Sequence, residues 1–313
     1  MNNLTLQSIR ALIEEENLLE GKKIDTIKRL EGGLINFTYR VILQNNPKSF
    51  ILKYYPSYIA SIPDVYLSSS RCFFERHALQ NLPSLIQCSK TPSFINGTQS
   101  INIIEDKGIL PSLKVVHSHR TIEEIAIWLA HLHENTKSLS QNERDLWNNN
   151  DIQRSRKQNQ YDYLAENIDH PQSQKLMYTL GQKLLQPGIC TIMGDLWPSS
   201  ILIDKMEFWV IDWEFSHFGR PLQDVSHICA HFILMEQPSY CRLFLENYLR
   251  LVSEELQMDV TSYDATVHFC AEILMRLIGL FKDKKQPILR EWALDILKQK
   301  ISFSDLISKE IFP

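Results

Sequence analysis

The hydrophobic period of this chain changes near residue 105, and that change most limits how the chain can fold. Between residues 24 and 105 the apolar residues mostly follow strand-like patterns, as in FTYRVIL (37–43) and SFILKYY (49–55), which are rich in β-branched and aromatic residues. Beyond residue 105 the apolar positions recur at helical spacing. We therefore expect an α+β chain with a small β-rich lobe over residues 1–105 and a larger helical lobe over 106–313.

Three further elements are expected in the β-rich lobe. The N-terminal residues up to about Gly21 predict an amphipathic helix, and residues 68–82 predict a second helix, because serines precede apolar residues near helical spacing. Residues 93–105 predict a β-hairpin around Asn96-Gly97, a dipeptide favoured in two-residue hairpin loops.

The helical lobe begins with residues 121–136, where Thr121 would cap a helix that places apolar residues on one face. Further helices are expected at about 173–186, 224–236, 239–257, 262–282, 288–299 and 303–311. One stretch interrupts them: ILI (201–203) and FWVI (208–211) flank the turn DKME. This stretch predicts a β-hairpin that faces the junction between the lobes.

Composition excludes several classes of protein. The chain has 313 residues, 44% hydrophobic and 22% charged, as in ordinary globular proteins. A net charge of −4 gives no general attraction to nucleic acid or to an anionic membrane, and no apolar run approaches the roughly 20 residues that span a bilayer. Six cysteines without a CxxC pair favour reduced thiols. We expect a cytoplasmic monomer or homodimer without a nucleic-acid or membrane partner.

Two aspartates of the interrupting stretch follow short apolar runs. Asp195 follows CTIMG and begins the loop LWPSS, and Asp212 follows FWVI. Strands that end in carboxylates typically deliver acids to a shared cleft, although such residues also serve as plain strand-end caps. Carboxylates in a cleft can hold the cations that phosphoryl transfer requires.

The remaining parts for phosphoryl transfer occur in a workable order. Gly32-Gly33 lead into a strand, so backbone amides there could approach phosphate oxygens without a Cβ in the way. Lys53 lies in the following strand as a point charge for phosphates. Glu75 lies on the next helix, where it would hold Lys53 or form an ordinary surface ion pair. Ser200, five residues after Asp195, is either a site residue or a turn residue.

The segments GDLWPSSILID and VIDWEFSHFGRPLQDVS resemble the catalytic and metal-binding segments of the aminoglycoside phosphotransferase and choline kinase family. The segments EGGLINFTYRV, FILKYY, RCFFERHAL and AIWLAHLH extend the resemblance, in the family's order, over residues 25–235. The resemblance implies a bilobal protein-kinase-like fold. It also implies transfer of the γ-phosphoryl of ATP, or of GTP, to a hydroxyl of a small molecule.

By this resemblance Asp195 would be the catalytic residue, and Asp212 and Ser200 would bind Mg²⁺. The implied nucleotide-binding residues are Gly32, Gly33, Asn36, Lys53, Glu75, Ile104 and Asp106. Two positions depart from the family: Met193 replaces the usual His, and Ser200 replaces the usual Asn. These departures keep open the alternative of a pseudokinase that binds nucleotide and acts through partners. A protein kinase is disfavoured, because no activation loop follows Asp212.

The acceptor stays open among sugar-like, aminoglycoside, choline and homoserine types. Candidate acceptor-binding residues are Trp197, Glu214 and Arg276. Arg276 lies in AEILMRLIGL, which is similar to a segment of methylthioribose kinases, and a structural ion pair is its default role. A cationic acceptor would require an aromatic cage or a cluster of acids, for which Glu207, Glu214, Glu236 and Glu272 are available.

Two features near residue 230 have alternative interpretations. Asp224 would either cap a helix or support the catalytic loop through hydrogen bonds. The sequence HICAH (227–231) places His227 and His231 one helical turn apart around Cys229. Such a pair can bind metal, but packed histidines without a third ligand are commoner.

Overall fold

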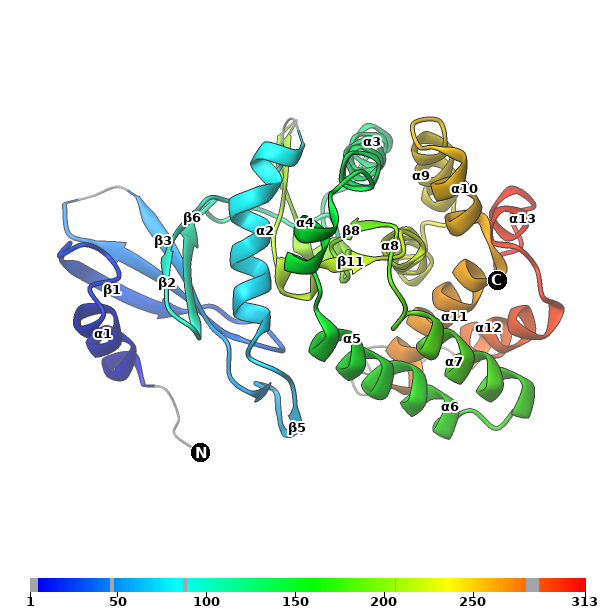
Figure 1. Ribbon diagram of the computed structural model, residues 1–313, viewed down its shortest axis with the longest axis horizontal. Helices are drawn as coiled ribbons and strands as arrows, with labels where there is room; N and C mark the ends of the chain where they lie inside the picture. Colours follow the sequence, from blue (N-terminus) through cyan, green and yellow to red (C-terminus); the bar gives the residue numbers. More distant parts are fainter. Residues whose placement is uncertain (1–4, 46–47, 87–88, 206, 280–286) are drawn as a thin grey trace.

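The computed structural model describes residues 5–45, 48–86, 89–205, 207–279 and 287–313. A β-sheet in the N-terminal region is followed by a helical C-terminal region (Figure 1), and the expected α+β fold is confirmed. Three predicted features extend outside the described residues: the turn at 44–48, the turn DKME, and the end of the helix at 262–282.

The N-terminal sheet is antiparallel and has five strands. Their order is β1 (Ile24–Arg29), β2 (Phe37–Leu43), β3 (Ser49–Tyr54), β7 (Ile101–Glu105) and β6 (Phe94–Gly97). Helix α1 (Leu6–Glu15) ends before Gly21 and packs Ile9 and Ile13 against the strands. A small hairpin, β4 (Tyr58–Ile59) and β5 (Ile62–Tyr66), leads toward helix α2 (Arg71–Leu85).

Helix α2 lies between the sheet and the helical region (Figure 1). Its buried face, which includes Ala78, Leu79 and Leu82, belongs to the large core of the helical region. The helix therefore positions Glu75 between the sheet and the rest of the molecule.

The turn of the predicted hairpin at 93–105 is displaced from Asn96-Gly97. Gly97 pairs with Asn102 in the sheet, so the turn comprises residues 98–100. The Asn96 side chain donates a hydrogen bond to the Leu18 carbonyl, and a Cβ at Gly97 would lie 2.4 Å from the Ile101 oxygen. Tertiary contacts and close packing thus hold both residues in the strand.

The helical region starts with α3 (His119–Thr136), which is capped by Ser118 rather than by Thr121. The elements after α3 are α4 (Gln141–Leu146), α5 (Asn150–Arg156), the π-helical η1 (Lys157–Asp162), α6 (Tyr163–Asn167) and α7 (Pro171–Lys183). The later helices are α8 (Leu222–Leu234), α9 (Ser239–Leu249), α10 (Glu254–Thr261), α11 (Tyr263–Ile278), α12 (Pro287–Gln299) and α13 (Phe303–Ser308).

The single helix predicted over 239–257 is wrong, because the chain breaks between α9 and α10. The break is fixed by α3: the Ser253 amide donates to Glu134, and Lys137 donates to the Ser253 hydroxyl.

The predicted inserted hairpin is confirmed as β9 (Ile201–Asp204) and β10 (Glu207–Val210). Short 3₁₀ turns flank it, η2 (Pro198–Ser200) and η3 (Trp213–Phe215), and β8 (Cys190–Ile192) pairs with β11 (His217–Gly219). Behind this hairpin, α8 is buried along its whole length and α11 packs against it. Among the described helices, none is both long and apolar enough to cross a membrane.

Candidate active site

A cavity of about 620 Å³ lies between the sheet and the helical region. Its lining includes most of the residues that the sequence singled out: Gly32, Gly33, Asn36, Lys53, Asp195, Trp197, Asp212, Glu214 and Arg276. Four predicted site residues are not part of the lining: Glu75, Ile104, Asp106 and Ser200. The fold therefore brings residues that are far apart in the sequence to one cavity, and it leaves these four behind its wall or away from it.

Lys53 of β3 is buried and lies between two carboxylates. Its Nζ is 2.9 Å from Glu75 Oε1 and 2.8 Å from Asp212 Oδ1. Burial alone would lower the pKa of Lys53, but Asp212, Glu75 and Glu214 together raise it above its usual value. Lys53 is thus held as a fixed cation at the cavity.

Asp212 lies two residues after the end of β10, and its backbone is left-handed, with φ of 66°. Few residues other than glycine take this conformation, and such outliers are concentrated at functional sites. The side chain of Asp212 is 39% exposed, although one of its oxygens contacts Lys53. The other oxygen remains available to a ligand in the cavity. An exposed carboxylate of this kind suits Mg²⁺, which prefers hard oxygen ligands.

Ser200 is fully buried at the end of η2. Its hydroxyl donates to the Trp197 carbonyl at 2.8 Å, and the neighbouring Ser199 lines the cavity instead. The hydroxyl oxygen of Ser200 keeps acceptor capacity, but its fixed hydrogen bond also stabilises the turn.

Asp195 lies in the loop between β8 and η2, and Asp224 of α8 supports that loop. The amides of Met193 and Gly194 each donate to Asp224 at 2.8 Å, and His133 Nε2 lies 3.3 Å from it. Burial would raise the pKa of Asp224, but these partners hold it below its usual range. Asp224 therefore supports the loop and does not cap α8, whose N-cap position is Pro221.

Gly194 makes the same loop possible. Its φ is 81°, and a Cβ there would lie 2.4 Å from the Phe215 carbonyl oxygen. Glycine alone fits both conditions. Met193, which stands where the family usually has His, holds the loop through its backbone amide. The loop is therefore held without a His side chain at this position.

A buried network that the sequence did not suggest joins the two regions. Asn36 Nδ2 donates to Glu214 Oε1 at 2.7 Å, and Arg71 Nε and Nη2 donate to Asn36 Oδ1. Arg71 also lies 3.0 Å from Glu214. Burial raises the pKa of Glu214, while Lys53 and Arg71 oppose that rise. Glu214 lines the cavity, but its charge is compensated by Arg71.

Ile104 and Asp106 lie outside the cavity lining for two different reasons. Ile104 is buried in β7, where Ile51 and Phe94 flank it. The Asp106 carboxylate accepts hydrogen bonds from Arg40, Ser49 and the Gly108 amide. Burial alone would raise the pKa of Asp106, but these hydrogen bonds outweigh it and hold the pKa below its usual value. Both side chains are therefore occupied by contacts within the protein, Ile104 by packing and Asp106 by hydrogen bonds.

The far side of the cavity is formed by η2, α5, η1 and α11, and we call it the acceptor side because the expected acceptor-binding residues Trp197 and Arg276 lie there. The Arg276 guanidinium lies 5.0 Å from the centre of the Trp197 ring. No carboxylate among the described residues pairs with Arg276, so the expected structural ion pair is absent there. Arg156 and Gln160 also line this side and contact Glu272. Neither residue carried a recognisable sequence signal, because both lie in a segment without a clear period.

The fold is shared with solved kinases of small molecules. A putative fructosamine-3-kinase from Thermobifida fusca is 16% identical, with a TM-score of 0.57 over 95% of this chain and 99% of that one. The choline kinase of Streptococcus pneumoniae is 15% identical, with a TM-score of 0.54 over 93% of this chain and 99% of that one. These similarities define a protein of the kinase-like fold class.

The sequence comparisons identify the family. A family model described as the phosphotransferase enzyme family matches residues 94–258. A curated relative, 4-hydroxytryptamine kinase of Psilocybe cyanescens, is 23% identical over 272 residues, covering 74% of this chain and 75% of that protein. The chain belongs to the phosphotransferase enzyme family, and its activity class is that of a small-molecule kinase. The predicted family resemblance is confirmed.

Proposed function

We propose that this phosphotransferase moves the γ-phosphoryl of ATP, with GTP as the alternative donor, to a hydroxyl of a small acceptor. The observation that carries the proposal is the position of Lys53, within 3 Å of both Glu75 and Asp212 at a cavity that Asp195 also lines. A fixed cation beside an open carboxylate provides what a phosphate chain and its metal ion require.

In this proposal residues 1–105 form the nucleotide-binding lobe and residues 106–313 carry the catalytic loop and the acceptor side. Lys53 and the amides at Gly32–Gly33 hold the phosphates, and Asp195 orients or deprotonates the acceptor hydroxyl. Asp212 would hold Mg²⁺ with help from Ser200, and the ion would neutralise phosphate charge. Because the described cysteines are buried and free, we propose a reducing, cytoplasmic location.

The charges of the acceptor side favour a neutral, sugar-like acceptor over an aminoglycoside or choline. Glu272 is compensated by Arg156, which lies 3.1 Å away. Lys114 and Arg276 line the cavity without an ion-pair partner among the described residues. A cationic acceptor bound by acids would need uncompensated carboxylates at this side, and among the described residues that line it only Asp195 offers one. The kinship with a 4-hydroxytryptamine kinase supports a small hydroxylated acceptor in general.

Thermal unfolding with Mg-ATP tests the nucleotide site. A ligand at 100 times its Kd adds about 2.7 kcal/mol to stability, so the melting temperature of the parent should rise. Lys53→Ala should reduce that rise, because a fixed cation for the phosphates is lost. Lys28→Ala, at an exposed position of β1, is the control and should keep it. Equal rises in the parent and in Lys53→Ala would remove Lys53 from the nucleotide site.

A second experiment identifies the acceptor. It measures the consumption of ATP in the presence of each member of a panel of sugars, thiosugars, aminoglycosides, choline and homoserine.

A magnesium titration tests Ser200. Ser200→Ala should raise the Mg²⁺ concentration for half-maximal turnover, and Ser200→Asn should keep or improve activity at low Mg²⁺, because an amide carbonyl is a stronger ligand than a hydroxyl. Ser199→Ala is the matched comparison, since that neighbouring serine lines the cavity. A response to Ser199→Ala alone would transfer the role to Ser199. Turnover that appears only in Ser200→Asn would favour the pseudokinase alternative.

A further inference from the structure

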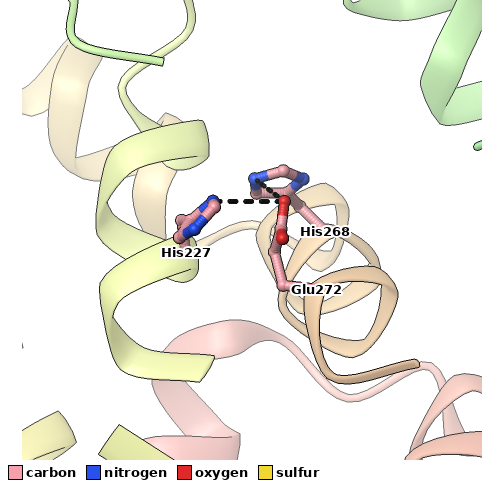
Figure 2. A group of neighbouring side chains, drawn as sticks. All are labelled: His227, His268 and Glu272. Atoms are coloured by element: carbon pink, nitrogen blue, oxygen red, sulfur yellow. Dashed lines mark ion pairs between the residues drawn. The ribbon is translucent and has the colours of Figure 1, made fainter. Parts of the chain in front are cut away.

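A cluster of ionisable side chains lies beside Asp195 and has no role in the proposal above. It consists of His227 from α8 and of His268 and Glu272 from α11, with the two histidine rings directed toward the carboxylate (Figure 2). Glu272 Oε1 is 3.2 Å from His227 Nδ1 and 3.5 Å from His268 Nε2. All three residues are buried.

The spacing of these atoms would suit a metal ion, but their other contacts oppose one. His268 Nε2 is 3.1 Å from the Gln223 carbonyl oxygen, so it carries a proton and donates, while Nδ1 accepts from the Tyr161 hydroxyl. Burial lowers the pKa of His268 to about 3, which keeps this ring neutral. The Arg156 guanidinium lies 3.1 Å from Glu272 Oε1, and a cation at that distance repels a second one. His231, which the sequence paired with His227, is not part of this cluster.

The neighbours of His227 decide which of its ring nitrogens carries the proton. Arg156 Nη2 makes the hydrogen bond to His227 Nδ1, at 3.3 Å, and a guanidinium can only donate, so Nδ1 accepts and the proton is on Nε2. Glu272 Oε1 is 3.2 Å from the same nitrogen, but the two atoms do not form a hydrogen bond. Glu272 holds Arg156 in that position and already accepts from Gln160 at 2.6 Å. Burial opposes the ionisation of Glu272, but its neighbours, Arg156 among them, hold its pKa well below the usual range, so it remains the anion that orients Arg156.

The Nε2 atom of His227 has no hydrogen-bond partner among the described residues, although the side chain is only 2% exposed. It lies 3.8 Å from Asp195 Oδ1, and both residues line the cavity. That distance is too long for a hydrogen bond. An acceptor oxygen bound to both would lie beside the pair, about 2.8 Å from each atom, at the apex of a triangle whose base is this distance. A buried donor without a partner is costly, so the site is built to receive an acceptor atom there.

We propose that His227 is a second acceptor-binding residue, whose Nε2–H donates to the same hydroxyl oxygen that gives its proton to Asp195. The inference rests on the proposed role of Asp195. When the hydroxyl reacts, its proton passes to Asp195, an oxygen lone pair forms the new P–O bond, and the bond from the γ-phosphorus to ADP breaks. His227 keeps its own proton and orients the oxygen.

This arrangement selects the chemical class of the reacting group. A hydroxyl can donate to Asp195 and accept from His227 at the same time, whereas a protonated amine can only donate. The pair therefore favours an alcohol or a phenol at the reacting position. A protonated amine there would place its N–H groups against the N–H donor of His227. Sites that hydrogen-bond a substrate hydroxyl reject analogues that lack the matching group more strongly than apolar pockets do.

Two variants and one control test the role of His227. For the best acceptor of the panel, or for water in the hydrolysis of Mg-ATP, His227→Leu should lower kcat/KM by about 10- to 100-fold, as the loss of a buried hydrogen bond predicts. The melting-temperature rise with Mg-ATP should be unchanged. His227→Gln should recover part of the loss, because its amide can donate from a similar place. The control is His231→Leu: His231 is one turn along α8, is also buried and is absent from the cavity lining, so the acceptor kcat/KM should change little.

The outcomes separate this inference from the proposed function. Turnover of His227→Leu equal to that of the parent, with Asp195→Asn inactive, would overturn the role of His227 and leave the phosphotransferase proposal intact. Parental turnover in Asp195→Asn would overturn both. Nitrogen-15 NMR of the histidine rings gives a second measurement that needs no turnover: the His227 proton should be on Nε2. A neutral ring protonated on Nδ1 would also refute the inference.

Discussion

Asp195→Asn should lower turnover by about 10²- to 10⁴-fold, the usual contribution of a group that accepts a proton in the transition state. The substitution keeps the shape of the side chain but removes its basic carboxylate. Mg-ATP binding should be nearly unchanged, because Lys53 and Asp212 contact one another and not Asp195. Initial rates with the best acceptor and the melting-temperature rise with Mg-ATP measure the two effects separately.

The control for this substitution is Asp204→Asn, at the exposed end of β9. It removes the same charge from the same hairpin, so an equal loss of turnover in both variants would point to general electrostatics rather than to a role of Asp195. Full turnover in Asp195→Asn would exclude this residue as the catalytic base.

Asp212→Asn should have the opposite signature: Mg²⁺-dependent nucleotide binding should be lost. The carboxylate is the charged ligand that the proposal assigns to the ion, and an amide supplies only a neutral oxygen. Mutation of a residue that only hydrogen-bonds to a metal ligand lowers metal affinity by about 10- to 100-fold. Loss of the ligand Asp212 itself should therefore lower the affinity for Mg²⁺ by at least that factor. The measurement is the Kd of ATP with Mg²⁺ and with a chelator present.

In Asp212→Asn the two Kd values should converge, whereas in the parent they should differ widely. Lys53 keeps its contact with Glu75 in this variant, so some metal-independent affinity for ATP should remain. A Kd with Mg²⁺ that matches the parent would show that the ion is held elsewhere. If both aspartate variants bound and turned over like the parent, the phosphotransferase site proposed here would be wrong.

The local pattern of the sequence was sufficient for most of the elements. Strand alternation predicted β2 and β3, and helical spacing predicted the helices α3, α7, α8 and α11. The errors occur where a distant segment decides the local structure. The cap of α3, the turn after Gly97 and the break between α9 and α10 each depend on a hydrogen bond or a close approach that a local window does not contain.

The residues around the cavity divide in the same way. Motif order led from the sequence to Lys53, Asp195 and Asp212, because phosphate chemistry needs a cation and carboxylates in segments of recognisable pattern. No sequence pattern pointed to Arg71, which compensates Glu214, or to Arg156, which orients His227. Their importance arises only from partners that lie far away in the chain.

By itself, the sequence determined the α+β fold class, the family and the residue types available for phosphate chemistry, because these depend on periodicity and on short motifs. Only the tertiary structure decided which of those groups are free to act. Burial makes an unpaired charge or donor costly, so each buried group takes the nearest partner that the fold supplies. Glu214 and Asp106 have such partners, whereas His227 Nε2 has none among the described residues and lies 3.8 Å from Asp195 Oδ1.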